Sequence, residues 1–129
     1  MSPRPWTLVI PAPTDWINAN ARIHHMERAR RTGAWRNAAA AHALADRLPV
    51  FTRCTIAATP RPVGARVRDA ANLYPTIKAC IDGLRDAAVL EDDHDGIVAS
   101  LTIYPCDPVP RMRGRLAVGQ LVLTITAVA

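Results

Sequence analysis

The sequence contains almost no lysine: Lys78 stands alone beside fifteen arginines in a chain of 129 residues. This bias accompanies an abundance of alanine and indicates a GC-rich coding sequence. The number of arginines is therefore only a weak guide to function. The same bias makes the one lysine that is present a candidate functional residue.

The sequence also lacks the hydrophobic runs that mark membrane and secreted proteins. No apolar segment approaches the roughly 20 residues that a membrane-spanning helix needs. The apolar stretch near the N-terminus, residues 6–10, is too short for the core of a secretory signal. We therefore expect a cytoplasmic protein that makes no membrane contact.

Cysteine is scarce, and its spacing excludes two kinds of chemistry. Cys54, Cys80 and Cys106 are odd in number and far apart, and no CxxC pair exists. Zinc sites and thioredoxin-type sites therefore have no support in the sequence. We expect three reduced thiols, most of them buried.

Charge is plentiful but unevenly distributed. The net charge is +5, and it divides into +8 over residues 1–68, −5 over 69–95 and +2 over 96–129. A basic body with one acidic segment is typical of a protein that binds a polyanion and holds metal ions against it. Basic charge that only keeps a small protein soluble would give a similar total.

The length and hydrophobic content predict one packed domain over residues 1–129. Period-two alternation or β-rich composition predicts four strands, at 6–10, 50–58, 97–105 and 121–128. Helical composition or an apolar stripe predicts two helices, at 34–47 with Thr32 as its cap and at 74–88. Residues 14–33 and 105–115 are expected to be loops. The order predicts an α+β fold, with a mixed four-stranded sheet covered by two main helices and a parallel strand pair across the second helix.

The candidate chemistry is concentrated in the segment 66–95, RVRDAANLYPTIKACIDGLRDAAVLEDDHD. Asp69 precedes the second helix and Asp93 follows it, and a helix of that length keeps its ends about 22 Å apart. The carboxylates can converge only if the chain after Asp93 runs back beside the strand before Asp69, or if the loop bearing Asp69 folds over. Carboxylate oxygens are the ligands that Mg²⁺ prefers, and a bound Mg²⁺ can activate water at a scissile phosphate.

Lys78 lies at the border of the second helix's apolar stripe, so its stem can cover apolar surface while its ammonium reaches outward. An ammonium in that position can stabilise negative charge on a phosphate. Two simpler interpretations stay open. Lys78 and Asp82 have the spacing of a surface ion pair, and Asp92 and Asp93 could belong to an ordinary polar turn.

The pattern resembles the RusA family of Holliday-junction resolvases. That family has an Asp-x-Asp-Asn-Leu motif, then a lysine, then an aspartate four residues later, and an Asp-Asp pair 10 and 11 residues further on. The residues here that match it are Asp69, Asn72, Leu73, Lys78, Asp82, Asp92 and Asp93. The proline- and asparagine-rich residues 10–22 and the final strand are also similar, so the resemblance covers most of the chain.

The resemblance implies a RusA-like fold and a structure-specific endonuclease that resolves four-way junctions in DNA recombination and repair. It implies Asp69, Lys78 and Asp93 as catalytic residues. Asp69 and Asp93 would bind Mg²⁺, with Mn²⁺ as a substitute, and Lys78 would stabilise the transition state. It also implies a homodimer, because a two-fold junction is served by two symmetric sites. The arginines implied in phosphate contacts are Arg22, Arg28, Arg30, Arg31, Arg66 and Arg68.

The sequence departs from the family pattern at two points. Ala71 replaces the second acid of the motif, a metal ligand in the family, and the spacing from Asn72 to Lys78 is three residues longer. Two alternatives therefore remain beside the resolvase. One is a dimeric DNA-binding protein of the same fold with weak or no cleavage. The other is a nuclease for branched DNA without junction preference. His94, next to Asp93, is a further candidate metal ligand.

Overall fold

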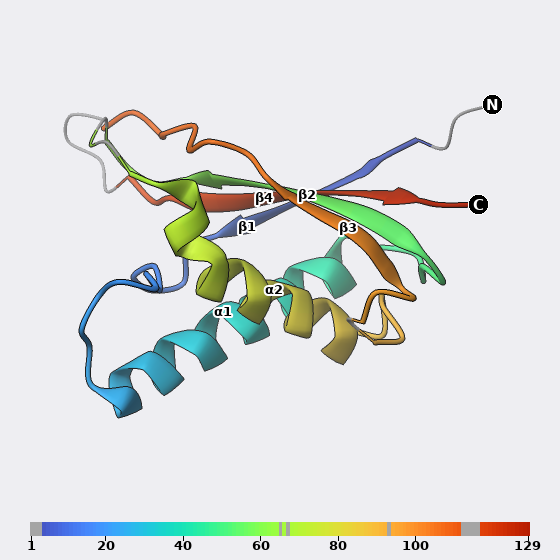
Figure 1. The fold of residues 1–129 in the computed structure, drawn as a ribbon, viewed down its shortest axis with the longest axis horizontal. Helices are drawn as coiled ribbons and strands as arrows, with labels where there is room; N and C mark the ends of the chain where they lie inside the picture. The colour runs from blue at the N-terminus through green and yellow to red at the C-terminus, as the bar shows by residue number, and fades with distance from the viewer. Residues whose placement is uncertain (1–3, 65, 67, 93, 112–116) are drawn as a thin grey trace.

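The computed structural model describes residues 4–64, 66, 68–92, 94–111 and 117–129 (Figure 1). In chain order its elements are β1 (Trp6–Pro11), α1 (His25–Ala45), β2 (Cys54–Arg61), the short 3-10 helix η1 (Ala70–Leu73), α2 (Tyr74–Asp86), β3 (Val98–Ile103) and β4 (Gln120–Ala127). The predicted order and the α+β class are confirmed. In the described part of the chain, no helix is long and apolar enough to cross a membrane.

The four strands form one mixed sheet in the order β1-β4-β2-β3. β4 pairs antiparallel with both β1 and β2, whereas β2 and β3 are parallel and are joined through α2. The strand that follows the acidic segment therefore runs parallel beside the strand that precedes Asp69. The residues just before β3 lie at the start of β2, whereas Asp69 follows the end of β2, so this pairing does not bring the two acidic segments together. Figure 1 shows α1 and α2 on the same face of the sheet.

The first helix begins earlier than predicted. α1 starts at His25, with His24 as its N-cap, so the predicted loop over 14–33 is wrong beyond residue 24. Thr32 is not a cap but lies inside the helix, where its hydroxyl donates to the carbonyl of Arg28 at 2.8 Å. The first turns carry glutamate, arginine and methionine. These are good helix formers, but they give no apolar periodicity for a pattern search to detect.

The boundaries of two further elements are also corrected. β2 begins at Cys54 rather than at residue 50, and it continues through Pro60 to Arg61 instead of ending at residue 58. Pro60 has no amide hydrogen to donate to β3. It is tolerated because the pairing of β2 with β3 ends at Ala58 and Ile103, before Pro60 is reached. α2 ends at Asp86 instead of 88, and Ala88 has a positive φ of 60°.

The core lies between the sheet and the two helices. From α2 it takes the predicted stripe, of which Ile77, Cys80, Ile81 and Leu84 are all buried. From α1 it takes mostly alanine, and the small side chains let the helices approach closely. At Gly83 on α2, an added Cβ would lie 2.9 Å from the Cβ of Ala39 and would clash with the backbone of α1.

The cysteines follow the prediction, and the tryptophans are divided between core and surface. Trp35 is buried and packs against Trp16 with ring centroids 4.8 Å apart, whereas Trp6, the first residue of β1, is exposed. All three cysteines are free thiols, and Cys54 and Cys80 are buried. Burial raises the pKa of both buried thiols, which keeps them protonated and unreactive.

Candidate active site and nucleic-acid interface

Lys78 lies in the first half of α2, at the border of the apolar stripe as predicted. Its Nζ donates to Oδ1 of Asp82 at 2.8 Å, one helical turn further on. The side chain of Lys78 is 40% exposed and that of Asp82 is 21% exposed. The ion pair that the sequence left open as an alternative is thus formed, and it fixes the direction of the ammonium without burying it.

The same lysine lines a cleft of about 220 Å³ between α2 and the edge strand β3. Tyr74 and Ile81 of α2 form one wall, and the first residues of β3 form the other. The cleft also contains the carboxylate-bearing Asp95. A lysine and an aspartate that are 17 residues apart in the sequence therefore line one concave site.

Asp95 is held by a tight turn ahead of β3. The amide of Gly96 donates to Nδ1 of His94 at 3.0 Å, and the amide of Ile97 donates to the carbonyl of His94 at 2.9 Å. The predicted ligand His94 is thus engaged in shaping this turn. Asp95 was not predicted as a site residue, because the family pattern stops two residues earlier. The available signal was its place in an acidic segment that comes shortly before a strand.

Of the two acids predicted after the helix, the structure describes Asp92. Asp92 is half-exposed, and its Oδ1 lies 3.6 Å from Nη1 of Arg85 on α2. Asp93, the predicted metal ligand and catalytic residue, lies outside the described residues.

Asp69 lies in a second cleft. It is the N-cap of η1, and its Oδ1 accepts a hydrogen bond of 3.0 Å from the amide of Ala71. This cleft, of about 260 Å³, is also lined by Arg68 and by Ile103 at the end of β3. Because Leu101 lines the first cleft and Ile103 the second, the two clefts follow one another along β3. Asp69 and Lys78 are on the same side of the molecule but not in one cleft.

Magnesium is the cofactor that the family resemblance implies. Among the residues that the structure describes, no group of three or more histidine, cysteine, aspartate or glutamate side chains could hold a metal ion. Asp69 and Asp95 each place one carboxylate in a cleft. Mg²⁺ often takes only one or two protein carboxylates and completes its shell with water and substrate phosphate. The described donors fit Mg²⁺ in kind, as single ligands.

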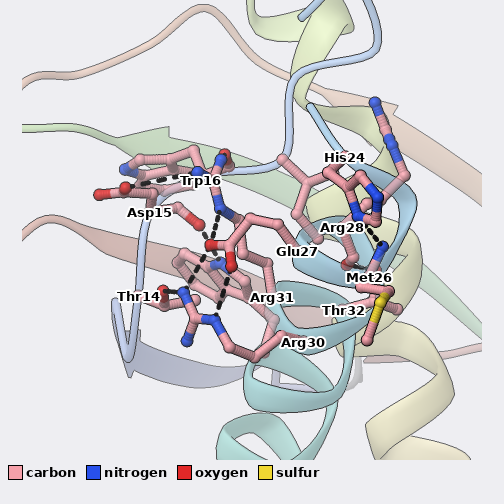
Figure 2. Close-up of polar contacts among 12 residues, drawn as sticks. Thr14, Asp15, Trp16, His24, Met26, Glu27, Arg28, Arg30, Arg31 and Thr32 are labelled. Atoms are coloured by element: carbon pink, nitrogen blue, oxygen red, sulfur yellow. Dashed lines mark hydrogen bonds and ion pairs between the residues drawn. The ribbon is translucent and has the colours of Figure 1, made fainter. Parts of the chain in front are cut away.

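The predicted DNA-binding arginines at the start of α1 form an internal network (Figure 2). Arg30 donates a bidentate hydrogen bond to the carboxylate of Glu27 at 2.7 and 3.0 Å, and Arg31 donates to the same carboxylate at 3.0 Å. Hydrogen bonds from both guanidinium groups lower the pKa of Glu27 to about 2. Arg30 also donates to Thr14, and Arg31 to the carbonyl of Trp16.

These contacts clamp the N-terminal loop onto α1. Arg28 adds hydrogen bonds to the carbonyls of Asn18 and Ala21 in the same loop. The side chain of Arg31 is only 16% exposed, so it has little surface left for a phosphate, whereas Arg30 remains exposed. The structure therefore gives these arginines an architectural role that composition did not indicate.

The other predicted arginines are near the Asp69 cleft or on the loop that reaches it. Arg68 donates to the carbonyls of Val63, Gly64 and Arg66 and lines that cleft. Arg66 and Arg22 are exposed. The loop before Arg22 is joined to η1, because the amide of Ala19 donates to the carbonyl of Asn72 at 2.8 Å.

A buried hydroxyl fixes the same loop to α2. Thr76 Oγ1 accepts from the amide of Ile17 at 2.8 Å and donates to the carbonyl of Ile17 at 3.0 Å. Thr76 is fully buried and satisfies both backbone groups at once. The N-terminal loop, η1 and the start of α2 are thereby held together beside Asp69.

The sequence was compared with models of known protein families and with curated proteins. No family model matches this chain, and no curated protein shows significant similarity to it.

Proposed function

We propose that this protein is a RusA-like endonuclease that resolves four-way DNA junctions by magnesium-dependent hydrolysis, within the cytoplasm and as a homodimer. The observation that carries the proposal is the position of Lys78. The only lysine of the chain lines a cleft with the carboxylate of Asp95, beside the cleft that contains Asp69. This is the segment in which the family motif places its active site.

The side chains have distinct parts in the proposed reaction. Lys78 holds its ammonium toward the phosphate and stabilises the negative charge that grows on it in the transition state. Asp82 is a positioning residue, because its hydrogen bond fixes the direction of that ammonium. In hydrolysis a water oxygen bonds to phosphorus, one ester P–O bond breaks, and the leaving oxygen takes a proton.

The proposed metal ligands are Asp69 and Asp93. A bound Mg²⁺ supplies Lewis acidity and lowers the pKa of its water. Asp95 is a further candidate ligand on the Lys78 side, because it is the described carboxylate that shares the cleft with Lys78, whereas Asp69 lies in the neighbouring cleft. The exposed residues Arg22 and Arg66, together with Arg68 in the Asp69 cleft, are the proposed phosphate contacts.

A DNA-binding protein of the same fold without cleavage is the second candidate. It is favoured by one observation. Ala71, which replaces an acid of the family motif, lines the Asp69 cleft, and its amide engages one oxygen of Asp69. A site with one carboxylate fewer binds a divalent ion more weakly, while phosphate contacts are unaffected.

Cleavage of an end-labelled four-way junction, beside a linear duplex with the same arm sequence, separates these functions. Both substrates are incubated with and without Mg²⁺ or Mn²⁺. The proposal predicts paired nicks in opposed strands of the junction, only with metal. Junction binding without nicks under either metal would contradict the resolvase and support the second candidate. Equal cutting of the duplex would indicate a nuclease without junction preference.

A further inference from the structure

Tyr74, the first residue of α2, gives the Lys78 cleft an aromatic wall. It is 45% exposed, although Leu73 before it and Thr76 after it are both buried. An exposed ring between buried neighbours does not serve the core. Tyr74, Lys78 and Ile81 are four and three residues apart, so they lie on one face of α2, and all three line the cleft.

The backbone around Tyr74 is held in place on both sides. The carbonyl of Asn72 accepts a hydrogen bond from the amide of Ala19 at 2.8 Å, and the hydroxyl of Thr76 binds both backbone groups of Ile17. These contacts fix the point from which the ring projects. A tyrosine side chain has only two χ angles to order, so it offers a large contact area at a low entropic cost.

The other walls of the cleft combine apolar surface with hydrogen-bonding groups. Ile81 and Leu101 are apolar, whereas Ser100 and Asp95 are exposed and supply a hydroxyl and a carboxylate. A nucleobase has the same division, because its π-faces stack and its edges carry donors and acceptors. The cleft of about 220 Å³ is smaller than the roughly 300–1,000 Å³ of pockets for drug-sized ligands, so it suits a single base.

We propose that this cleft binds one unpaired nucleotide, with its base stacked on Tyr74 and its phosphate at the ammonium of Lys78. A base inside a duplex has both faces covered by its neighbours, so only an unpaired or extruded base can stack on a protein ring. The inference rests on the proposed function and narrows its substrate to DNA with an unpaired nucleotide, as at a branch point. Tyr74 is then a specificity-determining residue.

The charges along β3 favour a nucleic-acid strand over a peptide side chain as the occupant. Lys78 lines the first cleft and Arg68 lines the second, so a strand that follows β3 meets a cation in each. Each cleft also contains a carboxylate, from Asp95 or Asp69. In the proposed function these carboxylates face a metal ion that lies against the phosphate, so they do not oppose the strand.

Fluorescence anisotropy with a labelled single-stranded oligonucleotide tests the inference, with EDTA present so that no cleavage occurs. The comparison ligand is an oligonucleotide of the same length in which every nucleotide is abasic. Both ligands have the same backbone charge, so a difference in affinity reports the bases alone. The natural protein is expected to bind the strand with bases roughly 5- to 150-fold more tightly, the range expected for stacking of one base.

Substitutions assign this preference to the ring of Tyr74. Tyr74→Ala is expected to bind both strands with equal affinity, whereas Tyr74→Phe keeps the ring and should keep the preference. Trp6→Ala is the matched control and should also keep it, because Trp6 is 43% exposed and lies on β1, at the opposite edge of the sheet from β3. Circular dichroism confirms that each variant is folded. Tyr74→Leu, which keeps an apolar side chain, repeats the test if Tyr74→Ala does not fold.

The inference is overturned if the natural protein binds the two strands equally, or if a folded Tyr74→Ala or Tyr74→Leu variant keeps the preference. Failure of the inference and failure of the proposed function give different results. A preference for bases that depends on Tyr74, without cleavage of junctions, would remove the nuclease and support the base site. Cleavage of junctions without a preference for bases would support the nuclease and remove the base site.

Discussion

The ammonium of Lys78 donates a 2.8 Å hydrogen bond to the carboxylate of Asp82, one turn along α2, and Lys78 lines the cleft that contains Asp95. In a helix a partly exposed pair of this kind contributes only about 0.3–0.5 kcal/mol to stability. If the pair is purely structural, removing it should change the unfolding free energy only slightly and should leave the cleavage rate unchanged. If Lys78 takes part in phosphate chemistry, removing it should lower the cleavage rate strongly.

Lys78→Ala is expected to lower the single-turnover rate of junction cleavage by about 10²-fold, because the transition state loses a positive charge near the phosphate. The free energy of unfolding should change by less than about 1 kcal/mol. The midpoint of a Mg²⁺ titration should stay the same, because lysine is not a metal ligand. A normal cleavage rate for Lys78→Ala would mean that Lys78 only forms a surface ion pair.

Glu27 should make stability depend on pH in the acid range. Its pKa is lowered from 4.5 to about 2 by Arg30 and Arg31, so the folded state favours the charged form. The resulting stability is fully present above pH 4.5 and is lost as the pH falls toward 2. Glu27→Gln should therefore melt below the natural protein at neutral pH, and this difference should shrink as the pH falls through that window.

Thermal melts of the two proteins between pH 7 and about pH 2 measure this effect. Asp46→Asn, at the opposite end of α1, serves as the control for removing one carboxylate from the same helix. A gap in melting temperature that stays constant with pH would mean that the contacts of Glu27 with the two arginines do not stabilise the fold.

The two helical glycines should respond to alanine in opposite ways. At Gly83 the new Cβ would meet the backbone of Arg36 and the side chain of Ala39, so α1 and α2 must separate. We expect a loss of about 1–3 kcal/mol in unfolding free energy. At Gly33, inside α1, nothing lies within 4 Å, and alanine should stabilise the helix by about 0.5–1 kcal/mol.

Urea denaturation of both variants tests this prediction, and each variant is the control for the other. If Gly83→Ala were as stable as Gly33→Ala, the close approach of α1 and α2 at this point would be wrong.

Thr76→Val should lower the unfolding free energy by about 1–3 kcal/mol, because it leaves the amide and carbonyl of Ile17 buried without a partner. Thr76→Ser keeps the hydroxyl and should cost less. Valine is close in volume to threonine, so the comparison isolates the hydrogen bonds. The measurement is urea denaturation, joined to limited proteolysis of the N-terminal loop. Equal stability of the two variants would refute the role given to this hydroxyl.

Local patterns made much of the fold predictable. Alternation located the strands, and the stripe from Ile77 to Leu84 located α2 and placed Lys78 at its border. The start of α1 was missed because its stabilising contacts are polar, between Glu27 and the following arginines, and leave no apolar period. The start of β2 was displaced because alternation does not distinguish a strand from the extended chain leading into it.

The candidate site was less predictable, because it depends on contacts between distant residues. The position of Lys78 follows from a single helix. The turn that carries Asp95 beside it depends on how α2 and β3 pack. Asp69 lies in a different cleft from Lys78 because it caps η1, and no sequence pattern predicted this short helix. The arginines that hold the N-terminal loop resembled a DNA-binding run, because their partners Thr14 and Trp16 lie in another segment.

The most direct test of the account is four-way junction cleavage by Asp93→Asn, with binding measured on the same samples. Asp93 is a proposed metal ligand, and asparagine at this position removes the negative charge without changing the size of the side chain. Asp46→Asn, at the C-terminal cap of α1 and in the lining of neither cleft, is the matched control. We predict that Asp93→Asn binds the junction with normal affinity in Mg²⁺ but makes no nicks, while Asp46→Asn cuts normally. Cleavage by Asp93→Asn at the natural rate would contradict it.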